Sequence, residues 1–352
     1  MMNRLLQTLL LGALLAPVLY AAPATLPKEL AEGVHAINCD GLPGTVLVLS
    51  DEAFPIARAK NWDGTATFAA AGATYGKGRA IYLGHPSFLT HGKLSDDTLA
   101  FHRNAVRWLS RNKPAPKIGV YRNPSIRNAL KRAGIESTLV ADTADFPRYD
   151  LIASIDFTVQ NAPAYLDFVR NGGGLLGAGL GWGWKQIASR SRAVSFADDF
   201  GDNRTFGPMG ILMGDIGIVR PDKQGFPLDP QTVPDGTRAD DALQIAAKDT
   251  YSSREQKRQV AVVLSQMAAV LPPSLPQGVL EKIAAFAKHP DAAKVPSPEH
   301  PVEPEDIFAR LAILARKAAY ETDRFRHWPA DPAAEVYPGL VKPGTPTVSR
   351  EI

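Results

Sequence analysis

The chain has 352 residues, and its 39 basic and 36 acidic side chains give a formal net charge of +3. A nearly neutral chain without a concentrated basic tract lacks the electrostatic footprint of a nucleic-acid-binding protein, so no nucleic-acid partner is expected. Its single cysteine, Cys39, excludes a fold built on internal disulfides. With 45% hydrophobic residues, the chain is able to bury cores for two domains.

The amino terminus has the pattern of a secretory signal. Arg4 supplies a positive charge, residues 5–20 are largely apolar, and small residues follow. We expect a signal peptide over residues 1–24, with cleavage before Thr25 or, alternatively, after Ala21. An uncleaved anchor is disfavoured because a spanning helix needs about 20 apolar residues, and this run is shorter and contains a proline. The sequence therefore predicts an exported protein, periplasmic or secreted, with no membrane span after cleavage.

A lead-in over residues 25–44 precedes the first predicted strands. Apolar and β-branched runs predict strands at Thr45–Ser50, Thr65–Thr74 and Arg79–Gly84. The turn Tyr75–Gly78 joins the last two strands as a hairpin. The spacing of apolar residues over Asp96–Arg111 predicts a helix, which nearby prolines end.

From residue 117 the chain alternates between strand and helix. Strands are predicted at Lys117–Tyr121, Glu136–Val140, Tyr149–Ile155 and Leu175–Ala178, and helices at Ser125–Ala133 and Ala162–Arg170. This order predicts a parallel sheet with helices on both faces. Ligands in such sheets bind beyond the carboxyl ends of the strands. The segments after Tyr121, Ile155 and Ala178 are therefore where a ligand is expected.

The second half of the chain is expected to be helical after an irregular segment. Residues 179–234 are rich in glycine and proline and indicate an ordered functional or capping excursion. Helices are then predicted at Arg238–Lys248, Ser253–Val270, Gln277–Lys288 and Glu303–Phe325. These elements divide the chain into an α/β domain over residues 45–235, a helical domain over 236–328 and an extended tail over 329–352.

A glycine-rich segment, Asn171–Trp184, surrounds the last predicted strand. The turn after such a strand can hold a catalytic nucleophile on a sharp elbow. Here that elbow falls at Gly179, Leu180 and Gly181, and leucine has no nucleophilic atom. The glycine spacing also departs from a dinucleotide or phosphate loop. Trp182 and Trp184 are either a core plug or a stacking platform, so the five residues of this turn are the candidates for ligand binding.

Histidines and acids cluster only between residues 85 and 102. His85, His91 and His102 lie near Asp96 and Asp97, but their spacing fits no zinc site, and no H-E-x-x-H motif occurs. We therefore expect no catalytic residue, no metal and no cofactor.

Several blocks together resemble a known family: Val46–Pro55, Ala70–Ser87, Asn104–Leu109, Gly172–Trp184 and Asn203–Ile211. They look like the amino-terminal region of the enhancin-like, mucin-degrading metallopeptidases and of the TRP-channel-associated factors. The resemblance implies a flavodoxin-like fold of the class I glutamine amidotransferase type that has lost its nucleophile, in agreement with Leu180. Residues 337–350 resemble the start of the peptidase domain, so the zinc motif of that family would lie beyond Ile352.

Three functions are consistent with these features. The first is an exported non-catalytic recognition or accessory protein that binds an extracellular glycan or glycoprotein. The second is a fragment or subunit of a mucin-degrading zinc metallopeptidase whose catalytic domain is absent from this chain. The third is a hydrolase with a site around His85 and Asp156. The missing elbow nucleophile favours the first.

Overall fold

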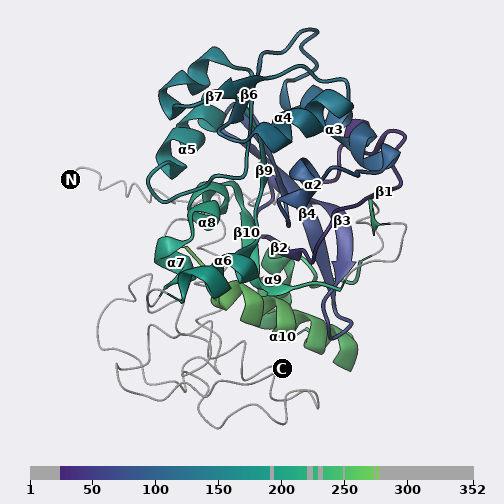
Figure 1. Cartoon of the computed structure of the whole chain (residues 1–352). Helices are drawn as coiled ribbons and strands as arrows, with labels where there is room; N and C mark the ends of the chain where they lie inside the picture. Colours follow the sequence, from purple (N-terminus) through teal and green to yellow (C-terminus); the bar gives the residue numbers. More distant parts are fainter. Residues whose placement is uncertain are drawn as a thin grey trace, which may run out of the picture.

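The computed structural model describes residues 24–190, 194–219, 225–228, 233–248, 250–272 and 275–276. Their centre is a nine-stranded mixed sheet (Figure 1). Its strands are β2 (Gly44–Val48), β3 (Ala53–Lys60), β4 (Ala66–Tyr75), β5 (Gly78–Leu83), β6 (Ile118–Tyr121), β7 (Thr138–Val140), β8 (Leu151–Ser154), β9 (Gly174–Ala178) and β10 (Ile211–Gly217). The strand order is β10-β2-β4-β5-β9-β8-β6-β7, with β3 paired to β4. A separate pair joins β1 (Ala36–Ile37) to β11 (Phe226–Pro227).

Helices fill the connections and continue after the last strand. The longer ones are α3 (Asp96–Leu109), α4 (Pro124–Arg132), α5 (Ala162–Arg170), α6 (Gly181–Ala188), α9 (Ala239–Lys248) and α10 (Arg254–Ala268). Short helical turns are α1 (Lys28–Ala31), α2 (Ser87–Thr90), α7 (Phe196–Asp199) and α8 (Gly201–Phe206), with 3-10 turns at Thr143–Arg148 and Gly207–Met209.

The parallel half of the sheet confirms the predicted fold class. Strands β5, β9, β8, β6 and β7 run parallel, with α4 between β6 and β7 and α5 between β8 and β9. From β6 the chain moves outward to β7, but from β8 it moves in the opposite direction to β9. Connections therefore diverge between β6 and β8, which makes this pair the topological switch point of a flavodoxin-like sheet.

The other half of the sheet is antiparallel. The predicted hairpin is present, because β4 and β5 pair from Tyr75 opposite Gly78 to Ala70 opposite Leu83. Two strands were not predicted from the sequence. β3 contains Pro55, which is tolerated because β3 pairs only with β4 and forms an edge. β10 lies inside the expected excursion and pairs with β2.

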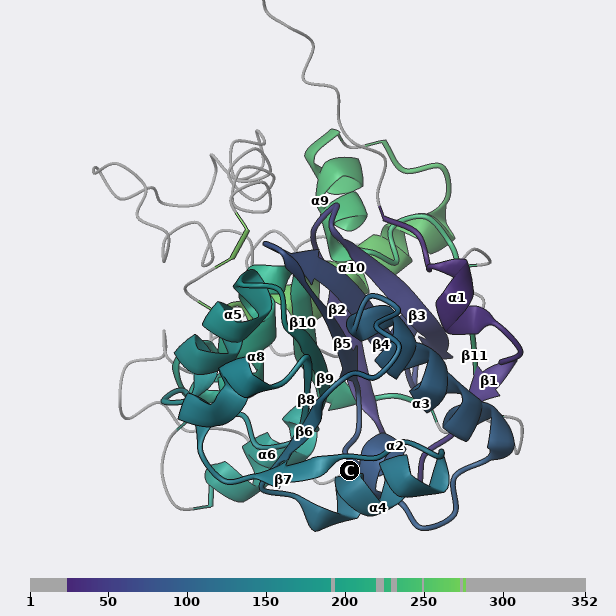
Figure 2. The same ribbon diagram turned by 90° about the horizontal axis from the view of Figure 1, so that it is seen from above.

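Alternating side chains of the strands build two hydrophobic cores, one on each face. In β5, Ala80 and Tyr82 enter one core, whereas Ile81 and Leu83 enter the other, as the two-residue period of a strand requires. Viewed from above, α3 and α4 lie on one side of the sheet and α5 and α8 on the other (Figure 2). The expected arrangement of helices on both faces is therefore confirmed.

The helices that follow the sheet complete one of these cores. Leu243 of α9 and Val260 and Val263 of α10 belong to the same hydrophobic cluster as Val46 and Leu212 of the sheet. Residues 277–288 and 303–325, expected to be helical, and the expected tail lie outside the described residues. The predicted division at residue 235 stays a prediction. Within the described part of the chain, no helix has the length and apolar character needed to cross a membrane.

Candidate functional site

The turn between β9 and α6 contains the predicted elbow, and its backbone is unstrained. Leu180 immediately precedes α6 with φ −145° and ψ 93°, which is ordinary extended backbone. A nucleophile elbow instead holds a serine or cysteine on a sharp, strained turn. Leu180 has neither the nucleophile nor the strained geometry of such an elbow.

The glycines of the turn allow close packing from below. A methyl group on Gly179 would collide with Oδ2 of Asp202 and the hydroxyl of Tyr82, and one on Gly181 would collide with the Gly214 carbonyl. The Tyr82 hydroxyl donates a 2.6 Å hydrogen bond to Asp202. Burial raises the pKa of Asp202 to about 7, although the bond from Tyr82 lowers it. Gly179 and Gly181 therefore serve the packing of the turn on its neighbours.

A short helical segment lies beneath this turn. Residues 198–209 form the end of α7, then α8 and a 3-10 turn. Asp202 packs under Gly179, and the Phe206 ring fills the space beside Gly177. Residues of this helical segment therefore close the space behind the turn.

The two tryptophans of the turn point to different neighbours. Residues two apart on a helix do not face each other. Trp182 Nε1 donates to the Leu42 carbonyl at 3.2 Å, whereas the Trp184 ring packs against Phe196 and Phe200 with centroids 5.2 and 4.9 Å apart. Both rings are partly buried. They thus form two separate surfaces, and ligand binding by either stays a prediction.

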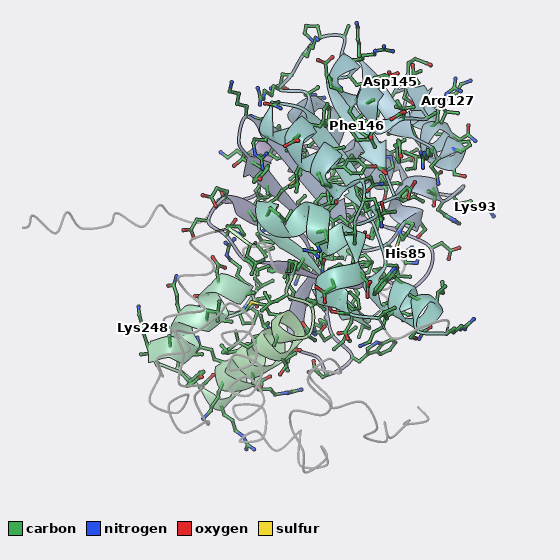
Figure 3. All side chains as sticks on the ribbon, turned by 90° about the vertical axis from the view of Figure 1, so that its left-hand side faces the viewer. His85, Lys93, Arg127, Asp145, Phe146 and Lys248 are labelled. Carbon is green, nitrogen blue, oxygen red and sulfur yellow. The ribbon has the colours of Figure 1, made fainter. Side chains whose placement is uncertain are left out.

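Two of the three histidines, His85 and His91, lie near Asp40, and His91 Nδ1 is 3.7 Å from Asp40 Oδ2. His85 is partly buried after β5 (Figure 3), where its Nδ1 lies 2.7 Å from Ser87 Oγ. Its pKa is lowered by burial. His102 is fully buried against the Phe88 carbonyl, and burial lowers its pKa to about 4. Within the described ranges, no group of three or more histidine, cysteine or acidic residues has metal-binding geometry.

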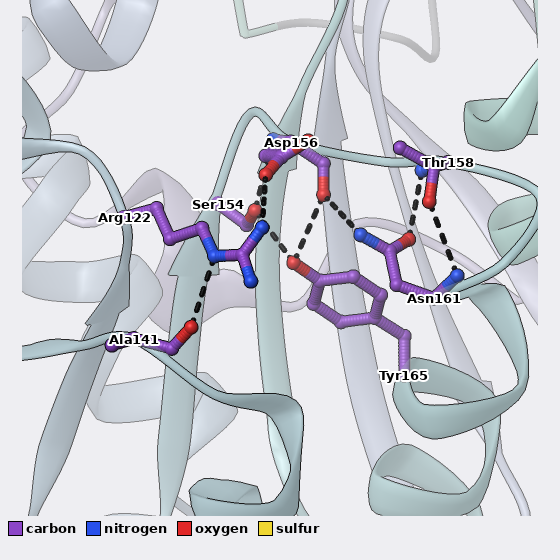
Figure 4. Close-up of polar contacts among 7 residues, drawn as sticks. All are labelled: Arg122, Ala141, Ser154, Asp156, Thr158, Asn161 and Tyr165. Carbon is purple, nitrogen blue, oxygen red and sulfur yellow. Dashed lines mark hydrogen bonds and ion pairs between the residues drawn. The ribbon is translucent and has the colours of Figure 1, made fainter.

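At the switch point, Arg122 follows β6 in an unusual backbone conformation. Its φ of 54° lies in the left-handed region, which costs a non-glycine residue about 1–3 kcal/mol. Three contacts hold it there, and Figure 4 draws the one to Ala141. Its amide donates to Val140 O and its Nε to Ala141 O, both at 2.9 Å, while the guanidinium stacks 4.7 Å from the Tyr121 ring centre. The guanidinium is therefore fixed in position before any ligand arrives.

Asp156 faces Arg122 from the loop after β8. Its Oδ2 lies 3.8 Å from Arg122 Nη1, and the two side chains are 40% and 58% exposed. The Asp156 backbone is anchored on both sides, because its amide donates to Ser154 Oγ and its carbonyl accepts from Asn161 Nδ2, each at 3.0 Å (Figure 4). At 3.8 Å the pair is too long for a hydrogen bond. Both groups therefore keep hydrogen-bonding capacity for a ligand.

The sequence predicted the position of this site but did not single out Arg122. It selected the segments after Tyr121 and Ile155 and considered Asp156 together with His85, yet His85 contacts Ser87 and Asp156 contacts Arg122. The available signal for Arg122 was its position, since it directly follows a predicted parallel strand and precedes Asn123 and Pro124, a helix-start pattern. Its left-handed backbone could not be predicted from residue type.

A cavity of about 1240 Å³ lies elsewhere, between β3, β11 and the start of α10. Most of its polar groups serve the fold: Gln259 bonds both backbone groups of Ala66, and Asp97 accepts from the His35 and Ala36 amides. Arg58 is the exception, because its buried Nε has no partner. The cavity wall combines two basic side chains with three acidic ones, which gives no preference for a charged ligand. We therefore assign no ligand to this cavity.

Comparison with known families decides the relationship. The TCAF_N family model, described as "TRPM8, N-terminal domain", matches residues 25–220, more than half of the chain. The chain belongs to the TCAF_N family. The resemblance deduced from the sequence blocks is confirmed.

Individual relatives of this TCAF_N protein are much longer. The TRPM8 channel-associated factor homolog of Danio rerio is 28% identical over 187 residues, covering 52% of this chain and 19% of the relative. TRPM8 channel-associated factor 2 is 29% identical in Bos taurus (55% and 20% covered) and 32% in Mus musculus (49% and 18%). The chain thus spans about a fifth of the relatives it matches.

Among solved structures, the IMPa metallopeptidase in complex with T-antigen is 14% identical with a TM-score of 0.45, covering 82% of this chain and 36% of that one. IMPa from Pseudomonas aeruginosa in complex with an O-glycopeptide gives 13% and 0.44, with the same coverage.

Proposed function

We propose that this TCAF_N protein is an exported, non-catalytic recognition or accessory protein that binds a glycan of an extracellular glycoprotein. One observation carries the proposal. The switch point presents the exposed pair Arg122 and Asp156, while the elbow position at the same edge holds unreactive Leu180. This edge is equipped to bind a ligand and lacks the nucleophile that would transform it.

The chemistry of the pair favours a polyhydroxylated ligand. Each sugar hydroxyl both donates and accepts a hydrogen bond. The guanidinium of Arg122 only donates and the carboxylate of Asp156 only accepts, so two neighbouring hydroxyls satisfy both side chains at once. Hydrogen bonds to charged groups are also the stronger kind. A simple anion would instead be repelled by Asp156.

The pair is also prepared for binding before the ligand arrives. Arg122 is held by Val140, Ala141 and Tyr121, and the Asp156 backbone by Ser154 and Asn161. Side chains that are already ordered lose less conformational entropy on binding. The left-handed backbone of Arg122 is a cost in stability of the kind that functional sites carry.

The accessory role agrees with the relatives. Their names describe association with a channel, which agrees with a partner-binding domain within a longer protein. Export belongs to the same proposal and rests on the amino-terminal pattern of residues 1–24. A role as part of a mucin-degrading metallopeptidase stays the alternative.

Binding to immobilised desialylated mucin, compared with the same mucin stripped of its O-glycans, tests the proposal. Arg122→Gly and Asp156→Asn should each weaken binding at least about tenfold. Arg122→Gly should keep its melting temperature, because relief of the left-handed strain offsets the lost contacts. Arg111→Gly is the matched control, since Arg111 also has a positive φ but lies near Gly172, at the amino ends of the strands. No preference for the glycosylated mucin would contradict glycan recognition.

A further inference from the structure

The turn between β3 and β4, residues 61–65, is held tightly by its own hydrogen bonds. The Asn61 amide donates to Thr65 O at 2.9 Å and the Gly64 amide to Asn61 O at 2.8 Å. The Asp63 carboxylate accepts from the Thr65 amide at 2.7 Å. Trp62 is different, because 63% of its surface is exposed. The turn is therefore rigid, and the indole ring of Trp62 projects from it.

A buried polar network connects this turn to the rest of the molecule. The Asn61 side chain is buried, and its Oδ1 accepts from Thr45 Oγ1 at 3.0 Å and from Gln266 Nε2 at 3.2 Å. Arg258 Nη2 donates to the Asp63 carbonyl at 2.6 Å. Thr45 belongs to β2 and the other two to α10. Anchoring to two separate elements fixes the position of Trp62 relative to the sheet.

Two residues connect the indole to the predicted ligand-binding turn. A methyl group on Gly217 would lie 3.5 Å from Trp62 Nε1 and 3.1 Å from Leu42 Cδ2, and the Leu42 carbonyl accepts from Trp182. Gly217 and Leu42 thus connect Trp62 to the β9–α6 turn. Two residues before Gly217 in β10, Asp215 forms a 2.6 Å ion pair with Lys185 of α6. We name Trp62 and Leu42 the Trp62 patch.

The size of the Trp62 patch indicates what covers it. A stable protein interface buries about 800 Å² on each partner around an apolar core. In the Trp62 patch, Trp62 is the exposed large apolar side chain, and Leu42 is partly buried. A single pyranose ring fits this surface better, because its C–H face is apolar and its rim consists of hydroxyls.

We propose that Trp62 is a stacking surface for one sugar ring of the bound glycan. This inference rests on the proposed function and adds a second contact to the Arg122–Asp156 pair at the same end of the sheet. Because the β3–β4 turn is rigid, stacking of a sugar ring on Trp62 orders few additional side chains, which favours affinity. The exposed ring contributes little to folding, so its removal should separate binding from stability.

The experiment measures binding of Trp62→Ala and Trp62→Phe to desialylated mucin and to mucin stripped of O-glycans. Trp62→Ala should bind the glycosylated form about tenfold more weakly, and Trp62→Phe should lose less because a phenyl ring still stacks. Leu139→Ala, which removes another exposed apolar side chain, should bind like the wild type. All three variants should keep the wild-type melting temperature.

The outcomes separate this inference from the proposed function. Wild-type affinity in Trp62→Ala, with binding lost in Arg122→Gly, overturns the stacking role and leaves the proposed function standing. Binding lost in Trp62→Ala but kept in Arg122→Gly supports the stacking role and removes the switch-point pair from the site. If the wild type binds both mucins equally and Trp62→Ala weakens both, the ligand is a peptide and the inference is overturned. A wild-type protein that binds neither mucin overturns it as well.

Discussion

The Tyr82 hydroxyl donates a 2.6 Å hydrogen bond to Asp202, and both atoms occupy the space where a side chain on Gly179 would lie. This contact joins β5 to α8 directly beneath the β9–α6 turn. The turn is therefore closed from behind by a buried acid and a phenol, and the surface that it offers to a ligand faces outward only.

Asp202 should make stability depend on pH. Its folded pKa of about 7 exceeds the ordinary 3.8, so between these values the folded state holds a proton that the unfolded state has released. The contribution of Asp202 to the unfolding free energy should then be greatest below pH 4, fall as pH rises to about 7, and level off above it. The loss attributable to Asp202 is at most about 4 kcal/mol.

Urea unfolding of Asp202→Asn at pH 5 and pH 8 measures this contribution. The amide cannot ionise, so the variant should lose less stability than the wild type between the two pH values. Asp198→Asn, with a 70% exposed side chain, should follow the wild type. An unchanged pH dependence in Asp202→Asn would show that this carboxyl is not the titrating group.

Gly179→Ala should destabilise the protein by about 1–3 kcal/mol, because the methyl group has no space beside Asp202 and Tyr82. Thermal unfolding measures the effect. Gly92→Ala is the control, since no atom lies within 4 Å of the added methyl group. Similar melting temperatures for the two variants would contradict the close packing.

Trp184→Ala should cost more stability than Trp182→Ala. The Trp184 ring packs against Phe196 and Phe200 at the margin of a hydrophobic core, and its loss should cost about 3 kcal/mol. Trp182 holds a single hydrogen bond to Leu42, so its removal should cost about 1–2 kcal/mol. Chemical denaturation compares them, and a larger loss for Trp182→Ala would reverse the assignment.

The purified protein should hydrolyse neither casein nor mucin, with or without added zinc. The elbow holds Leu180 in place of a nucleophile, and the sequence has no H-E-x-x-H motif. Product analysis by mass spectrometry checks this. Cleavage that is abolished both by a chelator and by His85→Ala would refute it.

The parallel part of the fold could be predicted because its strands are short apolar runs separated by amphipathic helices. The Leu175–Ala178 run carries that signal plainly, since it is buried on both faces. β3 gave no such signal because Pro55, Arg58 and Lys60 interrupt its apolar pattern, which is acceptable only on an edge strand.

The site was predictable in position more than in detail. The rule that ligands bind beyond parallel strands selected the segments after Tyr121 and Ile155. That Arg122 adopts a left-handed backbone depends on its contacts with Val140 and Ala141, which are distant in sequence. The direction of Trp182 and Trp184 depends on α6 starting at Gly181, whereas glycines at 181 and 183 favour a turn.

Hydrogen exchange with and without desialylated mucin glycopeptides tests the central claim most directly, because it locates the ligand without any mutation. The account predicts slower exchange at residues 122–126, 154–161 and 179–184, with residues 111–117 unchanged and the glycopeptides intact. Protection confined to residues 111–117 and 171–174, at the amino ends of the strands, would contradict it.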